Sequence, residues 1–281
     1  MTTASITRQV TDAELGRYAE FVYERTGIRI SPQKKTLLSN RLRRRMKALG
    51  IDDYDAYYDL LVRLGVNDPE WDAFLQEITT HETYLFRDPN QWEWFSKVYL
   101  PDVQSQARRG ERKKVLRIWS AACSTGDEVY TIACCIADRV ANHSQWDIEI
   151  LGTDIGIGAL EEAKRARFSK RAMNQVSESM RRRFFQQVDD ETWEAKPVLR
   201  NWTRFRQHNL MEPLRARPMD LIFVKNVLIY FDPESKKTVF QNIDKALARD
   251  GLLVTGPAEG ISELLKQYER IQPWLHRKPA K

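Results

Sequence analysis

Histidine and cysteine are scarce in this chain of 281 residues, which contains four histidines and three cysteines. The histidines show no HxxxH spacing and no Cys/His ligand pattern, so a structural metal site is not predicted. An odd number of cysteines, two of them adjacent at positions 134 and 135, provides no disulfide framework and favours a reducing compartment. We therefore expect a cytoplasmic protein that binds no metal.

Long apolar runs and nucleotide-binding fingerprints are also missing. No run reaches the roughly 18 residues that span a bilayer, and the N-terminal segment lacks the basic head and apolar stretch of a secretory signal. Neither GxxxxGK[ST] nor GxGxxG occurs, which argues against a nucleoside triphosphate or dinucleotide site. The formal net charge of +6 favours an acidic partner, but it does not choose between nucleic acid, a membrane surface and an acidic protein.

The first part of the chain contains only helical patterns. Four segments repeat apolar residues at helical spacing between capping residues and glycines, at 12–27, 31–50, 52–65 and 69–79. The second segment carries an apolar stripe that should face the interior of the domain, made of Leu38, Leu42, Met46 and Leu49. The pattern predicts a small all-α domain over residues 1–75.

From residue 115 onward, strand patterns alternate with helical patterns. The apolar runs VLRIWSA, DIEILGTD, MDLIFVKNVLIYF and GLLVTG are bounded by turn residues, and amphipathic segments separate them. Strands that alternate with helices form parallel βαβ units, so we predict a doubly wound α/β fold. The stretch near residues 185–206 does not fit the alternation and is predicted to be a small β insertion.

The turn AACSTGDEVY, which follows the first predicted strand, indicates a small-ligand site. Ligands in such folds bind at the carboxyl edge of the sheet, where strands turn into helices. Asp127 and Glu128 stand at the start of the following helix, where they would repel a pyrophosphate. Carboxylates in this position suit a ligand with positive charge, such as S-adenosylmethionine.

Two further polar residues are predicted at the same edge of the sheet. Asp154 ends the second strand, where an acidic residue can accept hydrogen bonds from both ribose hydroxyls, and Asn226 lies in the run MDLIFVKNVLIYF. From the residues alone, Asp154 could instead cap the next helix and Asn226 could satisfy backbone groups in a loop. Cys123 could be a nucleophile, but no histidine lies near it in the sequence, so structural packing is favoured for it and for Cys134 and Cys135.

Five strings together resemble the CheR-type methyltransferases of bacterial chemotaxis: TTHETYLFRD, RIWSAACSTGDEVYTIA, ILGTDI, HNL and DLIFVKNVLIYFD. These enzymes transfer a methyl group from S-adenosylmethionine to glutamate side chains of chemoreceptors, giving methyl esters and S-adenosylhomocysteine. The resemblance implies a Rossmann-like class I methyltransferase domain over 92–281 with the β insertion. It also implies a linker over 76–91 that carries the ETYLFRD motif and joins this domain to the all-α domain.

The resemblance assigns roles to individual positions. Arg87 and Tyr230 are implied to be catalytic, with Arg87 orienting the substrate carboxylate. The implied cofactor contacts are His81, Thr83, Arg87, Ala122, Gly126, Glu128, Asp154, Asn209, Leu210, Asn226 and Val227. The chain departs from the family pattern in having His81 for asparagine, Lys225 for arginine before Asn226, and GPAE for GHSE at 256–259.

The helix predicted over 32–49 is strongly basic, and in this family the methylated receptor regions are glutamate-rich helices. We therefore predict that Arg41, Arg44 and Arg45 dock the substrate, although composition alone favours a solvated basic face. The implied partner is the cytoplasmic part of a chemoreceptor, the chain is expected to be monomeric, and no nucleic acid or membrane insertion is expected. The alternatives are a methyltransferase acting on another acidic protein or on nucleic acid, and a docking module without activity.

Overall fold

A computed structural model of the chain describes residues 8–65, 68–79 and 82–280. Its N-terminal lobe contains four α-helices and one 3-10 turn: α1 (Asp12–Thr26), η1 (Pro32–Lys34), α2 (Lys35–Leu49), α3 (Tyr54–Arg63) and α4 (Pro69–Ile78). Thr11 caps α1 in a capping box with Glu14, and Gly27 ends the helix in the left-handed region at φ 73°. The all-α domain predicted from helical spacing is confirmed, and its last helix reaches Ile78.

The α2 stripe is buried along most of its length against the other helices. Leu38, Leu42 and Met46 are at most 3% exposed and join aromatic side chains of α1, α3 and α4 in one core. Leu49 does not follow the prediction, since it is 41% exposed. It is the last residue before the Gly50 cap, where α2 has passed the end of the core.

The second lobe is built on a seven-stranded sheet with the order β6-β2-β1-β7-β8-β10-β9. The strands are β1 (Val115–Ala121), β2 (Asp147–Asp154), β6 (Thr203–Gln207), β7 (Met219–Val224), β8 (Leu247–Thr255), β9 (Glu269–Gln272) and β10 (Leu275–Arg277). The first five pair with one another in parallel, whereas β10 is antiparallel to both β8 and β9. This arrangement is the predicted doubly wound fold with an antiparallel edge.

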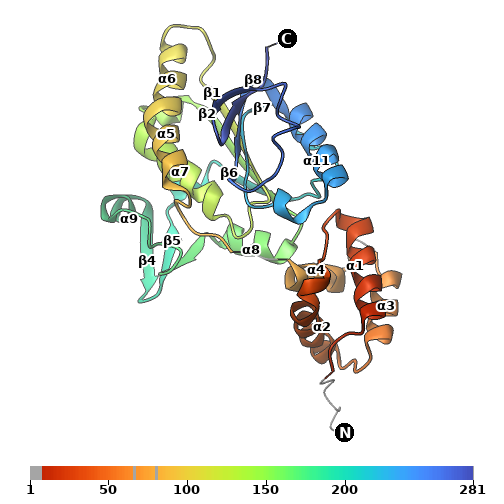
Figure 1. Cartoon of the computed structure of the whole chain (residues 1–281). Helices are drawn as coiled ribbons and strands as arrows, with labels where there is room; N and C mark the ends of the chain where they lie inside the picture. The colour runs from red at the N-terminus through yellow and green to blue at the C-terminus, as the bar shows by residue number, and fades with distance from the viewer. Residues whose placement is uncertain (1–7, 66–67, 80–81, 281) are drawn as a thin grey trace.

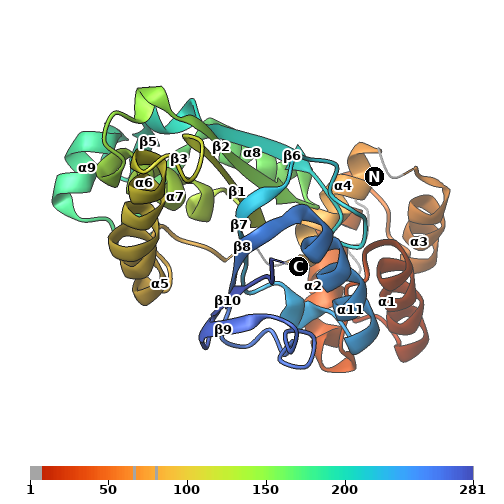
Figure 2. The ribbon, with the colours of Figure 1, turned by 90° about the horizontal axis from the view of Figure 1, so that it is seen from above.

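Helices cover both faces of this sheet (Figures 1 and 2). One face carries α5 (Pro89–Trp94), η2 (Phe95–Tyr99), α6 (Leu100–Arg108) and α7 (Asp127–Arg139), and the other carries α11 (Pro233–Ala246). Side chains along β1 alternate between the two, since Leu116 and Ile118 face the first layer and Trp119 faces the second. The strands are therefore buried on both sides, as their continuous apolar runs predict.

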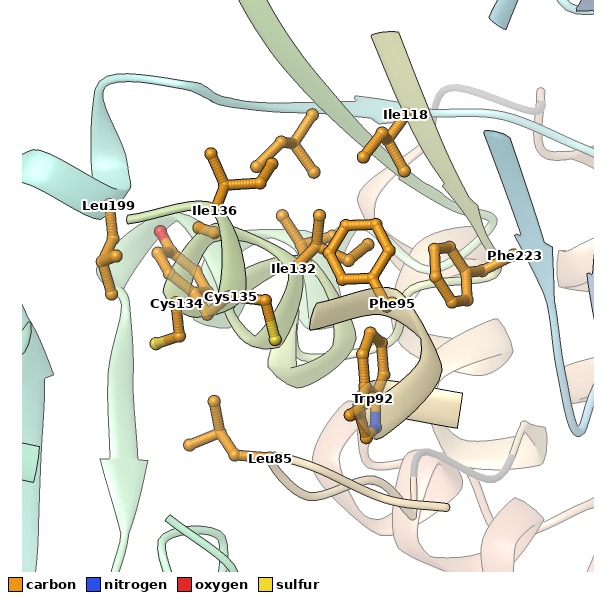
Figure 3. Close-up of a cluster of buried hydrophobic side chains, with 14 of the residues drawn as sticks. Leu85, Trp92, Phe95, Ile118, Ile132, Cys134, Cys135, Ile136, Leu199 and Phe223 are labelled. Atoms are coloured by element: carbon orange, nitrogen blue, oxygen red, sulfur yellow. The ribbon is translucent and has the colours of Figure 1, made fainter. Parts of the chain in front are cut away.

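The adjacent cysteines of α7 lie inside the first of these layers. Cys134 and Cys135 are fully buried among apolar side chains that include Leu85, Trp92 and Phe95 (Figure 3). Burial raises the pKa of both thiols, which opposes thiolate formation. The prediction that they are packing residues is confirmed.

The predicted β insertion is present, but it begins and ends earlier in the chain than predicted. A separate three-stranded sheet with the order β3-β5-β4 contains β3 (Arg167–Ser169), β4 (Phe185–Asp189) and β5 (Thr192–Ala195). It projects beside α9 (Glu178–Phe184) at the far side of the domain from the N-terminal lobe (Figure 1). The predicted range 185–206 included Thr203, but β6 pairs with β2 in the main sheet. β6 lies at the edge of the sheet and is only partly buried, so it tolerates arginine side chains. These arginines are the reason that the sequence pattern assigned β6 to the insertion.

Candidate active site

A pocket opens where the carboxyl ends of β1, β2 and β7 face the helical lobe. Both lobes line it, because α1, α2 and the segment after α4 close the side opposite the sheet. Its lining includes ten of the predicted cofactor and catalytic residues: Thr83, Arg87, Ala122, Glu128, Asp154, Asn209, Leu210, Asn226, Val227 and Tyr230. Residues distant in the sequence thus meet at the edge of the sheet where the topology predicts a ligand site.

Two predicted residues are not placed in this pocket. His81 lies outside the described residues. Gly126 is in the left-handed conformation at φ 87° and does not line the pocket. A Cβ added to it would lie 2.8 Å from Cβ of Ala163, so its visible role is the close packing of the turn on α8 (Ile157–Arg165).

The turn after β1 is held by the carboxylate of Asp154. The Ser124 amide donates to Oδ2 at 2.8 Å, and the Gly156 amide donates to Oδ1 at 3.0 Å. The N-cap of α8 is Gly156, without a side-chain cap, so Asp154 is not the capping residue of that helix. Asp154 is 5% exposed, and each carboxylate oxygen retains acceptor capacity for a hydroxyl.

A buried lysine that the sequence reasoning noted only as a departure organises the neighbouring acid. Nζ of Lys225 lies 3.2 Å from Oε2 of Glu128 and 3.0 Å from Oδ2 of Asp88, while Oε1 of Glu128 accepts from Ser120 at 2.8 Å. The ammonium also lies 5.1 Å from the centre of the Trp92 ring. Lys225 directly follows the apolar strand β7 at the edge of the sheet where ligands bind. This position in the sequence could have identified the lysine as a residue of the site.

The apolar run MDLIFVKNVLIYF is not one strand, contrary to the prediction. β7 ends at Val224, Asn226 has φ 58°, and a 3-10 turn, η4 (Leu228–Tyr230), follows. A left-handed residue cannot continue an extended strand, and this break directs Asn226 and Val227 into the pocket. The ring of Tyr230 lies beneath Nζ of Lys34, at 5.3 Å, so the helical lobe contributes directly to this part of the site.

The ETYLFRD motif crosses from one lobe to the other against this pocket. Leu85 is fully buried, and the Phe86 amide donates to Oγ1 of Thr131 at 3.0 Å, which anchors the segment to α7. Nη1 of Arg87 donates to the Glu82 carbonyl at 2.9 Å. The carboxylates of Glu82 and Asp88 pair instead with Arg171 and Lys225.

His208 is a second pocket residue that the sequence reasoning did not assign. Its Nε2 is buried without a hydrogen-bond partner, and burial lowers its pKa to about 4. The ring is therefore neutral at physiological pH and is able to hydrogen-bond a polar ligand without repelling a cation. Next to it, Nδ2 of Asn209 donates to the Arg25 carbonyl at 2.9 Å, which ties the pocket to α1.

The three arginines predicted to dock the substrate have different surroundings. Arg41 lines the pocket and donates to the Ile78 carbonyl at 2.6 Å. Arg45 turns toward α4 and pairs with Glu70, with 3.1 Å between Nε and Oε1. Arg44 lies 2.6 Å from Glu77, and its side chain is 63% exposed. The three arginines therefore do not form one solvated face, because Arg45 pairs with Glu70 of α4.

The donor set of the pocket fits S-adenosylmethionine. Glu128 and Asp154 present acceptors for an ammonium group and for ribose hydroxyls, and apolar surface from Leu210 and Val227 suits an adenine ring. Oγ of Ser124 is buried without a partner at the same turn, so it offers one more hydrogen-bonding group. Thr83, Glu128, Asp154, Asn209 and Asn226 would hold the cofactor.

Comparison with known proteins identifies the family. A family model described as "CheR methyltransferase, SAM binding domain" matches residues 81–274, and "CheR methyltransferase, all-alpha domain" matches residues 13–79. The chain belongs to the CheR methyltransferase family. It is an S-adenosylmethionine-dependent methyltransferase, and the two matches correspond to the two lobes of the structure.

Individual relatives extend over nearly the whole chain. The chemotaxis protein methyltransferase of Borreliella burgdorferi is 29% identical, covering 96% of this chain and 95% of its own length. The proteins of the same name from Salmonella typhimurium and Escherichia coli are 31% and 30% identical, each covering 92% of this chain and 88% of its own length. Within the described residues, no helix is long and apolar enough to cross a membrane, and no group of three or more acidic, histidine or cysteine side chains is placed to hold a metal ion.

Proposed function

We propose that this chain methylates glutamate side-chain carboxylates of chemoreceptors and forms S-adenosylhomocysteine as the second product. The observation that carries the proposal is that a guanidinium, Arg87, lines the same pocket as the predicted cofactor acids Glu128 and Asp154. A planar guanidinium matches a carboxylate bidentately, so the pocket offers one place for a cationic cofactor and another for an anionic substrate. Its relatives are named chemotaxis protein methyltransferases, which supports a role in chemotaxis.

The proposed methyl transfer depends on orienting the substrate carboxylate and does not need a proton-transfer step. Bound S-adenosylmethionine supplies a methyl carbon that its sulfonium makes electrophilic. A glutamate side chain, with an ordinary pKa of about 4.3, is already ionised at neutral pH, so no general base is required. Arg87 would hold the incoming carboxylate in line, and Tyr230 would border the reacting atoms from the loop after β7. Leu38 and Ile28 of the helical lobe close the pocket and would exclude water.

The proposed partner is the glutamate-rich cytoplasmic helix of a receptor, which the basic face of α2 would attract. We propose that the enzyme acts as a cytoplasmic monomer. The family assignment does not favour the nucleic-acid alternative, nor the reading of the chain as a docking module without activity.

Alkaline release of methanol tests the reaction class directly. Receptor cytoplasmic fragments or RNA would be incubated with the chain and with S-adenosylmethionine labelled in its methyl group. Carboxyl methyl esters hydrolyse in base and give volatile labelled methanol, whereas methyl groups on nucleobases stay attached. Label that appears only on receptor and is released by base supports the proposal. Base-stable label on RNA, or no transfer to either, contradicts it.

Charge reversal at Arg44 is expected to raise the KM for receptor by about five-fold at low salt, because an exposed charge contributes roughly 0.5–1 kcal/mol to encounter with an acidic helix. The increase should shrink at high salt, where charges are screened within a few ångströms. S-adenosylhomocysteine affinity should not change, since Arg44 does not line the pocket. The matched control is Arg63→Glu on the exposed surface of α3. Equal KM values for Arg44→Glu and Arg63→Glu would mean that α2 has no special role in docking.

In part of this family the β insertion captures a short peptide from the receptor tail by adding a strand to its sheet. Here the insertion contains no glycine between Arg171 and His208, and it is a few residues shorter than the family pattern of the tail-binding members. We expect no measurable affinity for such a tail peptide in a fluorescence titration. Micromolar binding would refute this expectation, and removal of the effect by Val188→Lys, on the exposed part of β4, would locate it.

A further inference from the structure

The loop that follows β7 presents its amide groups to a carboxylate that lies outside the pocket. Asn226 is left-handed at φ 58°, and Val227 follows with φ −123° and ψ −40°. Successive residues of opposite handedness turn their N–H groups toward one side and form a concave anion site. The amides of Asn226 and Leu228 both point to that side, and neither has a backbone partner among the hydrogen bonds of the described chain.

The anion in this site is the side chain of Glu259. Its Oε1 accepts from the Asn226 amide, and its Oε2 accepts from the Leu228 amide at 2.8 Å. Glu259 is 2% exposed, which is unusual for a carboxylate. Burial raises the pKa of Glu259, whereas the amide hydrogen bonds and the nearby Lys236 favour the charged form.

The segment around Glu259 is shaped to admit this carboxylate. A Cβ at Gly256 would collide with Oε1 of Glu259 and would lie 3.1 Å from the Asn226 nitrogen. The glycine of the GPAE sequence is therefore required by the close approach of the carboxylate to the loop.

Glu259 does not line the active-site pocket, whereas Asn226, Val227 and Tyr230 do. We infer that Glu259 is a positioning residue: its carboxylate binds the loop amides from behind and holds Asn226 and Val227 in the conformation that contacts the cofactor. The inference rests on the family's cofactor binding and is independent of the receptor substrate.

The test compares Glu259→Gln with Gly256→Ala and with the control Glu263→Gln, whose side chain is 81% exposed on the same segment. Glutamine keeps the shape of Glu259 but removes the charge and opposes one amide with an NH2 group. We expect S-adenosylhomocysteine affinity to fall by about ten-fold or more in calorimetry, the loss expected from one charge-assisted hydrogen bond. Gly256→Ala should act in the same direction by displacing the carboxylate, and Glu263→Gln should bind like the wild type.

A double-mutant cycle separates positioning from general destabilisation. If Glu259 acts through Asn226, the affinity losses of Glu259→Gln and Asn226→Ala are not additive, because either change removes the same contact. Additive losses, or an unchanged affinity in Glu259→Gln, would overturn the inference.

Hydrogen exchange in the wild-type chain supplies a measurement that does not depend on the folding of any variant. The amides of Asn226 and Leu228 should exchange slowly, although they lie in a loop, because both are donated to a buried carboxylate. Rapid exchange at both positions would contradict the inference even if every variant failed to fold. If the wild-type chain bound no S-adenosylhomocysteine, the cofactor assignment would fail instead, and the exchange result would still report on Glu259.

Discussion

Asp154→Ala is expected to weaken S-adenosylhomocysteine binding by at least about 100-fold, which corresponds to the loss of two hydrogen bonds to a charged acceptor at roughly 1.5–3 kcal/mol each. The carboxylate is proposed to accept from the ribose, and it also binds the amides of Ser124 and Gly156. Its removal therefore costs direct contacts and loosens the turn that carries Ala122 and Ser124 into the pocket. Isothermal calorimetry on the folded variant measures the effect.

The control is Asp147→Ala, because Asp147 lies at the opposite end of the same strand and is exposed. It should leave cofactor affinity within about two-fold of the wild type, as expected for a surface substitution. Circular dichroism and thermal melts on both variants establish that the strand is intact. A folded Asp154→Ala variant with wild-type affinity would remove Asp154 from the cofactor site.

Much of the fold follows from signals that act over short distances in the sequence. Thr11, Gly27 and Asp232 are caps in the structure because hydroxyl, glycine and carboxylate groups satisfy helix ends locally. The meeting of Glu128 with Asp154 was also predictable, since parallel strands bring their carboxyl ends to one edge. The caps depend on contacts within one helical turn, and the meeting of Glu128 with Asp154 depends on the order of the parallel strands.

The features that escaped prediction depend on partners distant in the sequence. Lys225 is buried because Asp88 and Glu128 both approach its ammonium, and no local pattern announces that arrangement. The strand β6 carries arginines and became recognisable only through its pairing with β2. Arg45 points inward because Glu70 of another helix is there to receive it.

Contacts between residues distant in the sequence also make both lobes part of the site. Lys34 over Tyr230, the Asn209 bond to the Arg25 carbonyl and the pairing of Arg29 with Asp232 all join the helical lobe to the pocket. The helical lobe thus forms one wall of the candidate active site, and it also carries the proposed docking surface. The ETYLFRD segment, anchored to α7 by the Phe86 amide, connects the two lobes beside this wall.

Arg87→Lys is expected to lower the turnover of receptor methylation by about 100-fold while changing S-adenosylhomocysteine affinity by less than about three-fold, because only the guanidinium fork can hold a carboxylate bidentately. The backbone of residue 87 is anchored independently of its side chain, since its carbonyl accepts from Trp92 and the preceding amide is bound to Thr131. Lysine keeps the positive charge, so a change in attraction for the acidic substrate does not account for the loss. The measurements are initial rates at saturating S-adenosylmethionine and calorimetry with the product.

Arg171→Lys is the matched control for this change. Arg171 pairs with the Glu82 carboxylate beside the same motif, but it does not line the pocket, so lysine should substitute for it with little effect on either quantity. The loss of turnover in Arg87→Lys, compared with its loss of product affinity, then shows whether Arg87 binds the substrate or the cofactor. A large loss of turnover with intact product affinity places its guanidinium on the substrate carboxylate, as proposed. Equal losses in turnover and affinity would place it on the methionyl end of the cofactor instead, and substrate orientation would then have to come from Tyr230 and Lys34.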